Sequence, residues 1–266
     1  STPVAVIGRE AVQLTFQAEQ GVGSRTITAM NLDARGEPGK GLTKALFTGA
    51  GTPGCADRRT AGPECYVEYR EQNAGAGRVA KAGSLEVALK PGMSSIEEAN
   101  FSQWVRFNEG LLGTVAAHAK YVPDTGTLEL SGTEPGTTFT YVINEQIRID
   151  ATRIDVTLAG PKMKATGKVS SVLQPPKPTE KKGDTKMPSM LKGDQVVFIA
   201  ADALDYDASL SKATYTGNAK LWQSETSVHA ETIALDNKNG DLTGSGAVTT
   251  SAMLQMKSEK DKAKKE

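Results

Sequence analysis

Apolar and polar residues alternate with a period of two along most of the chain, which is the pattern of β-strands that bury one face. The clearest runs lie at 12–16, 85–89, 127–130, 147–150 and 215–221. Clusters of Pro, Gly, Asn and Asp, which favour turns, separate them at 90–92, 123–126, 134–136 and 237–240. Helical periodicity is scarce. The sequence therefore predicts an all-β protein built from many short strands.

Internal repetition organises these strands. One unit begins at Ala230, passes through Ile233 and Leu242, and ends with Gly246 and Val248. The same spacings occur earlier in the chain, at Ala151, Ile154, Met163, Gly167 and Val169, and again at Ala116, Leu128 and Gly132. Each unit is predicted to form two strands around a turn, then a Gly and a further strand. Because a single two-stranded unit is only marginally stable in water, the copies must stack.

The unit at roughly 194–251 carries the most specific motifs. They are Ala201-x-x-Leu204-x-Tyr206-Asp207, Gly217-Asn218-x-x-Leu221-x-Gln223, Ala230-x-x-Ile233 and Leu242-x-x-x-Gly246-x-Val248. This series resembles the OstA-like repeat of periplasmic lipopolysaccharide-transport (Lpt) proteins. The likeness is weaker over 78–173, where residues 142–146 replace the Gly-Asn strand. Residues 27–33 are faintly similar to the inner-membrane-anchored, LptC-like member of the same system.

The resemblance implies a fold and a function. The fold is an open, V-shaped β-jellyroll (a β-taco) of stacked OstA-like repeats, with a groove that binds the acyl chains of lipopolysaccharide. The function is to shuttle or bridge lipopolysaccharide from the inner to the outer membrane, powered by an ATPase elsewhere. The implied partners are other Lpt bridge proteins, or further copies of the chain, joined by edge-to-edge β-strand pairing. The resemblance implies neither a cofactor nor an enzymatic activity.

Elementary physics favours such a groove, because each CH₂ of an acyl chain exposed to water costs about 0.8 kcal/mol. Unpaired strands at the ends of an open sheet are also templates for a neighbour's strand. The candidate groove residues share apolar strand faces: Leu204, Tyr206, Tyr215, Ala219, Leu221, Ile233, Leu235, Leu242, Ile147 and Ile149. The alternative interpretation is a closed β-solenoid that serves as a structural or adhesive interaction module, since inward aliphatic residues in most β-proteins form a closed core.

Composition shifts divide the chain. We expect an N-terminal, LptC-like β region over 1–77, OstA-like repeats over 78–173, a Pro/Lys-rich loop or linker over 174–193 that is solvated at 174–186, a further repeat over 194–256 and a disordered charged tail over 257–266. The sequence leaves open whether one continuous sheet or two domains result.

The two cysteines bear on the compartment. Cys55 and Cys65 flank a turn-rich segment that could close a short disulfide loop in an oxidising environment, and two free thiols are the alternative. The periplasmic location that the resemblance implies requires an export signal or an N-terminal anchor, and neither is visible in this chain. No apolar run approaches the roughly 20 residues that span a bilayer.

Composition narrows the function classes. The chain of 266 residues has 31 Lys+Arg against 31 Asp+Glu, and this balance argues against a nucleic-acid surface. Two His and two Cys leave little material for metal sites or nucleophile–base chemistry. Residues 37–44 lack the Walker spacing of a phosphate loop, and hydrolase and zinc-protease motifs are absent from the sequence. An aromatic fraction of 5% discourages a glycan-binding interpretation.

Overall fold

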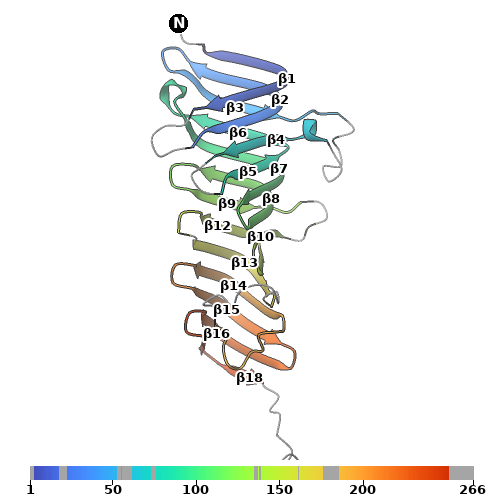
Figure 1. The fold of residues 1–266 in the computed structure, drawn as a ribbon, viewed down its shortest axis with the longest axis vertical. Helices are drawn as coiled ribbons and strands as arrows, with labels where there is room; N and C mark the ends of the chain where they lie inside the picture. Colours follow the sequence, from blue (N-terminus) through green and yellow to red (C-terminus); the bar gives the residue numbers. More distant parts are fainter. Residues whose placement is uncertain are drawn as a thin grey trace, which may run out of the picture.

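The computed structural model of the chain describes residues 3–17, 23–52, 55, 62–72, 76–134, 137, 139–160, 162–175 and 186–251. These residues form one 18-stranded sheet with antiparallel pairing. The sheet is an elongated stack whose strands run across the long axis, with β1 at one end and β18 at the other (Figure 1). The predicted all-β fold is confirmed.

The strands are β1 (Ala5–Phe16), β2 (Arg25–Glu37), β3 (Gly41–Thr48), β4 (Val67–Glu71), β5 (Arg78–Ala82), β6 (Ser84–Leu89), β7 (Ile96–Glu109), β8 (Leu112–Val122), β9 (Thr127–Ser131), β10 (Thr140–Asn144), β11 (Ile147–Ala151), β12 (Arg153–Thr157), β13 (Lys162–Leu173), β14 (Val197–Asp207), β15 (Lys212–Gln223), β16 (Thr226–Asp236), β17 (Asp241–Ser245) and β18 (Thr249–Ser251). Short 3-10 turns occur at η2 (Pro63–Cys65) and η3 (Pro91–Met93).

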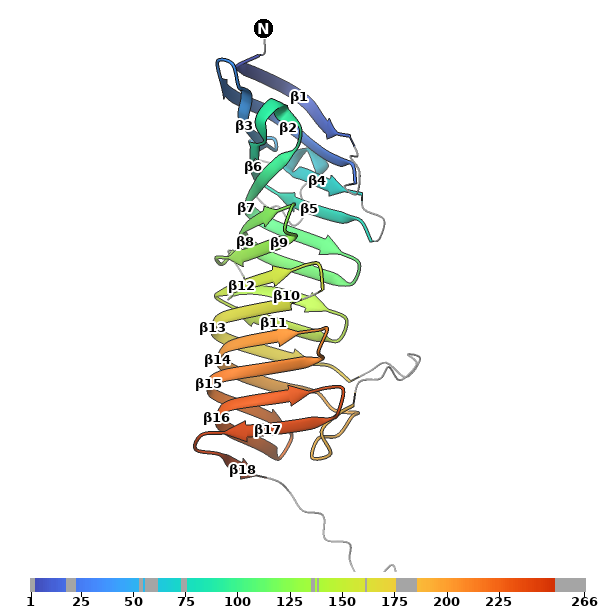
Figure 2. The same ribbon diagram turned by 90° about the vertical axis from the view of Figure 1, so that its left-hand side faces the viewer.

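The long strands bend and cross from one wall of the stack to the other. The two ends of β16 show this, because residues 232–236 pair with β17 and residues 227–229 pair with β18. We call wall A the wall formed by β3, β6, β9, β12, β17 and the adjoining halves of the long strands. Wall B is formed by β4, β5, β10, β11, β18 and the other halves. Figure 2 shows the stacked strands and their connecting turns from the side.

Paired left-handed residues make the bend between the walls. Positive φ angles at Glu10-Ala11, Gln103-Trp104, Gly167-Lys168 and Gly217-Asn218 coincide with register shifts in the strand pairing. Such bulges bend a strand and increase its twist. At Gly167 a Cβ atom would lie 2.7 Å from Thr152 Oγ1. The repeated glycines of the sequence therefore mark the bent edge of the stack.

Hairpin turns form the two free edges opposite the bend. We call these edges the lips, and the space between them the mouth. The lip of wall A contains turns such as 208–211 and 237–240, and the lip of wall B contains turns such as 145–146 and 224–225. This arrangement of two walls, one bent edge and one mouth is the V-shaped jellyroll geometry that the resemblance implied.

The sheet is continuous across the predicted linker, because β13 pairs with β14 from Lys162–Asp207 to Leu173–Val197. Residues 176–185 and the predicted tail 257–266 lie outside the described residues. Leu191, within the predicted loop or linker over 174–193, is 8% exposed and packs in the core. The boundaries of the other segments stay predictions. Within the described part of the chain, no helix is long and apolar enough to cross a membrane.

Candidate functional site between the two walls

The residues predicted to line a groove come together between the walls. On wall A, Leu204 lies beside Tyr215, and Tyr215 lies beside Ile233, on successive strands. A second row on wall A, nearer its lip, contains Met163, Tyr206, Ala213, Leu235 and Leu242. Because such rows run across the strands, they follow the long axis of the stack (Figure 2).

Wall B carries matching rows. One contains Ile149, Ser171, Ile199, Leu221 and Val228. Another, nearer the lip, contains Ile147, Leu173 and Val197. Ala219 lies beside Ala230 where the strands leave the bend. Both walls therefore present nearly continuous apolar rows to the interior, and the residues predicted from the alternation lie on them.

The interior is closed at these positions. Ala219, Leu221 and Ile233 are 0% exposed, and Leu204 is 2% exposed. Tyr215, Leu235 and Ile149 are also buried, whereas Ile147, Tyr206 and Leu242 are half-buried and pack against the same cluster. The side chains of the two walls thus exclude water from each other. An acyl chain can lie between them only after the walls separate or a side chain leaves.

The interior excludes water, and this disfavours the charged forms of the ionisable side chains within it. Burial raises the pKa of Tyr215 to about 12, because the phenolate would lose its hydration on entering the interior. Such surroundings disfavour charged groups and favour hydrocarbon.

A cluster of buried charges interrupts the apolar interior near the mouth in the N-terminal half. Arg25 and Glu71, which are 4% and 3% exposed, form an ion pair with 3.2 Å between Nε and Oε2. Arg78 places Nη1 3.1 Å from Glu71 Oε1 and Nε 3.0 Å from Glu109 Oε1. The two guanidinium groups and two carboxylates balance in charge, as buried ions require.

Two tyrosines complete this cluster. The hydroxyl groups of Tyr69 and Tyr121 donate hydrogen bonds to Glu71 Oε2 at 2.8 and 3.1 Å. Burial raises the pKa of both tyrosines, and the charge of Glu71 raises it further. Burial opposes the charge of Arg78, but Tyr121, Glu109 and Glu71 raise its pKa overall.

Sequence reasoning missed this charge cluster, although a signal was present. In β4 the inward positions are Val67, Tyr69 and Glu71, so the period-two pattern already placed the carboxylate of Glu71 inside. Interpreting it required the partners Arg25 and Arg78, which come from other strands.

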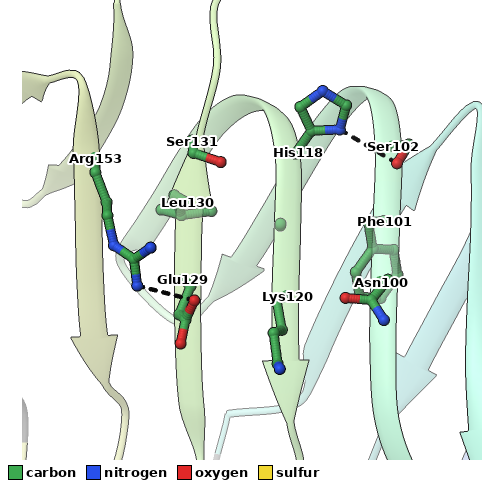
Figure 3. A pocket seen from close by; sticks show the side chains of 10 residues that line it. Asn100, Phe101, Ser102, His118, Lys120, Glu129, Leu130, Ser131 and Arg153 are labelled. Carbon is green, nitrogen blue, oxygen red and sulfur yellow. Dashed lines mark hydrogen bonds and ion pairs between the residues drawn. The ribbon is translucent and has the colours of Figure 1, made fainter.

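A polar pocket of about 160 Å³ lies over β7, β8, β9 and β12 of wall A (Figure 3). In it His118 Nδ1 lies 3.3 Å from Ser102 Oγ. Arg153 Nη2 donates to Glu129 Oε2 at 2.9 Å. Because Glu129 pairs with Arg153 and not with His118, the pocket does not hold a Ser-His-acid triad.

The two cysteines lie beside the bent edge. Cys55 and Cys65 form a disulfide with a Cα–Cα distance of 5.3 Å. A Cβ atom on Gly49 would lie 2.2 Å from the carbonyl oxygen of Cys65, so the backbone of Cys65 packs directly on the end of β3. Among the described residues, no group of three or more His, Cys, Asp or Glu is placed to hold a metal ion.

No protein-family model and no curated protein matches the chain. The chain is similar to the crystal structure of LptH, the LptA homologous periplasmic component of the conserved lipopolysaccharide transport device from Pseudomonas aeruginosa. The match has a TM-score of 0.41 and 12% sequence identity, and it covers 55% of this chain and 95% of that chain.

Proposed function

We propose that the chain binds lipopolysaccharide by its acyl chains and carries it from the inner to the outer membrane along the interior between the walls. The observation that carries this proposal is the set of apolar rows that face the interior from both walls, such as Leu204–Tyr215–Ile233 on wall A and Ile199–Leu221–Val228 on wall B. A row of this kind offers similar apolar contacts along the whole stack, so an acyl chain can move along it without exposing its CH₂ groups to water.

The two ends of the sheet supply a means of extending the interior beyond one stack. β1 is the terminal strand, and Val6 and Ile7 on it are 37% and 59% exposed. β18 ends the sheet at the opposite pole (Figure 1). Strands with free backbone groups accept a further strand from a neighbour. We infer that other bridge components, or further copies of the chain, join at these ends by edge-to-edge pairing.

The proposed location is the periplasm. The Cys55–Cys65 disulfide supports it, because disulfides persist in oxidising compartments. The OstA-like motifs support the same location.

Photo-crosslinking tests the proposal. A photoreactive side chain at Leu204, Leu221 or Ile233 is expected to capture lipopolysaccharide, because these positions face the interior. The control is Lys238, on the turn between β16 and β17. Capture at Lys238 equal to capture at the three interior positions would contradict the proposal.

The second candidate function is a structural or adhesive interaction module with a permanently closed core. The observation that favours it is the complete burial of Leu221 and Ile233. The same crosslinking experiment separates the two, because a permanently closed core captures no lipid at Leu204, Leu221 or Ile233.

A further inference from the structure

Residues 186–195, which we call the strap, connect the two lips across the mouth. At one end the backbone N–H of Lys186 donates to the carbonyl oxygen of Asn237 at 2.7 Å, on the lip of wall A. At the other end Lys192 and Gln195 contact Gln223, on the lip of wall B. Asn237 and Gln223 lie just beyond the opposite ends of β16, which itself crosses both walls. The strap therefore connects directly, across the mouth, the two lips that β16 connects around the bend.

The side chain of Gln223 holds the strap to wall B. Its Oε1 accepts a hydrogen bond from the N–H of Lys192 at 2.6 Å, and its Nε2 donates to the carbonyls of Lys192 and Gln195 at 2.8 and 3.1 Å. Gln223 is 3% exposed and follows Ala219 and Leu221 on the inward face of β15. A buried amide in an apolar interior needs such partners, and here the strap backbone supplies them.

Apolar side chains of the strap enter the interior. Leu191 is 8% exposed and belongs to the core cluster, while Met187 and Met190 are half-buried and pack against it. A Cβ atom on Gly240 would lie 3.2 Å from the carbonyl oxygen of Met187, so the strap also fits closely against the lip of wall A. These unbranched or flexible hydrocarbon groups occupy space between the lips that an acyl chain would need.

The strap can leave without breaking any strand pairing. Two of its own hydrogen bonds, Leu191 N–H to Pro188 O at 2.9 Å and Gln195 N–H to Lys192 O at 3.3 Å, are local and can move with it. The sheet beneath the strap is held by backbone hydrogen bonds between strands, since β14, β15 and β16 pair along their lengths. The sequence preceding the strap, 176–185, contributes no aliphatic or aromatic side chain besides proline.

We propose that the strap is a built-in occupant of an acyl-chain site: Met187, Met190 and Leu191 fill the mouth of the C-terminal half until an acyl chain displaces them. This inference rests on the proposed function and adds a regulation to it. An acyl chain can bind only to those protein molecules in which the strap is open. Its apparent affinity is therefore lower than its affinity for the open form, in proportion to the fraction of molecules that are open. Loading therefore becomes selective for ligands with enough hydrocarbon to compete.

The test uses the full chain and cis-parinaric acid, an 18-carbon fatty acid that fluoresces in apolar surroundings. Gln223→Ala removes the three hydrogen bonds that the Gln223 side chain makes to the strap, leaves the bond from Ser224 Oγ to Gln195 Oε1, and is expected to tighten the apparent Kd about tenfold. Replacing Met187, Met190 and Leu191 together by Ser is expected to act in the same direction. The matched control is Glu225→Ala, an exposed position on the same turn as Ser224, which should leave the Kd unchanged.

Hydrogen exchange on the unaltered protein provides a second readout that needs no variant. The N–H of Lys192, bonded to Gln223, should be protected in the free protein and lose its protection when the probe is bound, while amides of β15 stay protected. Equal Kd values for the unaltered protein and both strap variants, with Lys192 still protected when probe is bound, would overturn the strap as an occupant and leave the acyl conduit standing. No binding by any variant would overturn the conduit, and the strap inference with it.

Discussion

Tyr121 on wall A donates its hydroxyl hydrogen bond to Glu71 on wall B at 3.1 Å, and the same hydroxyl accepts one from Arg78 Nη1 at 2.7 Å. This polar contact joins the walls in the N-terminal half of the stack, whereas the strap joins the lips in the C-terminal half. The two halves of the mouth are thus closed by different chemistry. Opening the first half breaks a buried ion cluster, and opening the second displaces hydrocarbon and one amide.

The ion cluster should make a large contribution to stability. Glu71→Gln leaves the buried guanidinium groups of Arg25 and Arg78 under-compensated, and we expect it to lower the free energy of unfolding by about 3–5 kcal/mol. Glu68→Gln is the matched control, since Glu68 pairs with Arg70 and Lys81 on the outer surface and should cost less than about 1 kcal/mol. Urea denaturation followed by circular dichroism measures both. Equal losses in the two variants would show that the cluster does not hold the walls.

The bent edge should depend on glycine. Gly167 has a φ of +78°, and a Cβ there would lie 2.7 Å from Thr152 Oγ1. Gly160 has a φ of +66°, with nothing within 4 Å of its Cβ position. Gly160→Ala is therefore expected to cost about 1–2 kcal/mol from backbone strain alone. Gly167→Ala should cost about 2–5 kcal/mol, because the collision with Thr152 adds to the strain. Thermal unfolding of both variants tests the difference, and a loss at Gly160 as large as that at Gly167 would argue against a packed corner.

Buried tyrosines should limit stability in alkali. The folded-state pKa of Tyr215 is raised to about 12, against about 10 in the unfolded chain. Its stabilising contribution is therefore complete below about pH 10 and is lost as pH rises toward 12. A shift of this size corresponds to about 2–3 kcal/mol. Tyr215→Phe should lose less stability than the unaltered protein between those pH values. Parallel pH profiles of denaturant unfolding for the two proteins would show that Tyr215 ionises freely in the folded state.

The period-two pattern was enough to predict which side chains face inward. Leu204, Leu221 and Ile233 lie in the interior because strand alternation is a local property that each run of sequence carries by itself. The repeated glycines coincide with a feature that the repeat did not predict, since Gly167 and Gly246 lie at the bend between the walls. Local sequence patterns therefore account for the strands, for the side chains that face inward and for the glycines at the bend.

The closure of the mouth was not predictable in the same way. A closed core and an open groove both require inward aliphatic residues, so the alternation around Leu221 is the same for either. Met187, Met190 and Leu191 follow a Pro/Lys-rich stretch, and composition predicted only a loop or linker there, not which of its side chains are buried. Their burial depends on Gln223 and on the opposite lip, which are long-range partners that no local pattern specifies.

The central claim is that the closed interior opens to admit acyl chains. The most direct measurement is the distance between spin labels at Leu210 and Glu225, exposed positions on the turns at the two ends of β15, with and without lipopolysaccharide. Because the interior residues are almost fully buried in the closed form, the account predicts a longer label-to-label distance when lipopolysaccharide is bound. An unchanged distance at saturating lipopolysaccharide, with the Lys192 N–H still protected from exchange, would contradict it and would favour a permanently closed core.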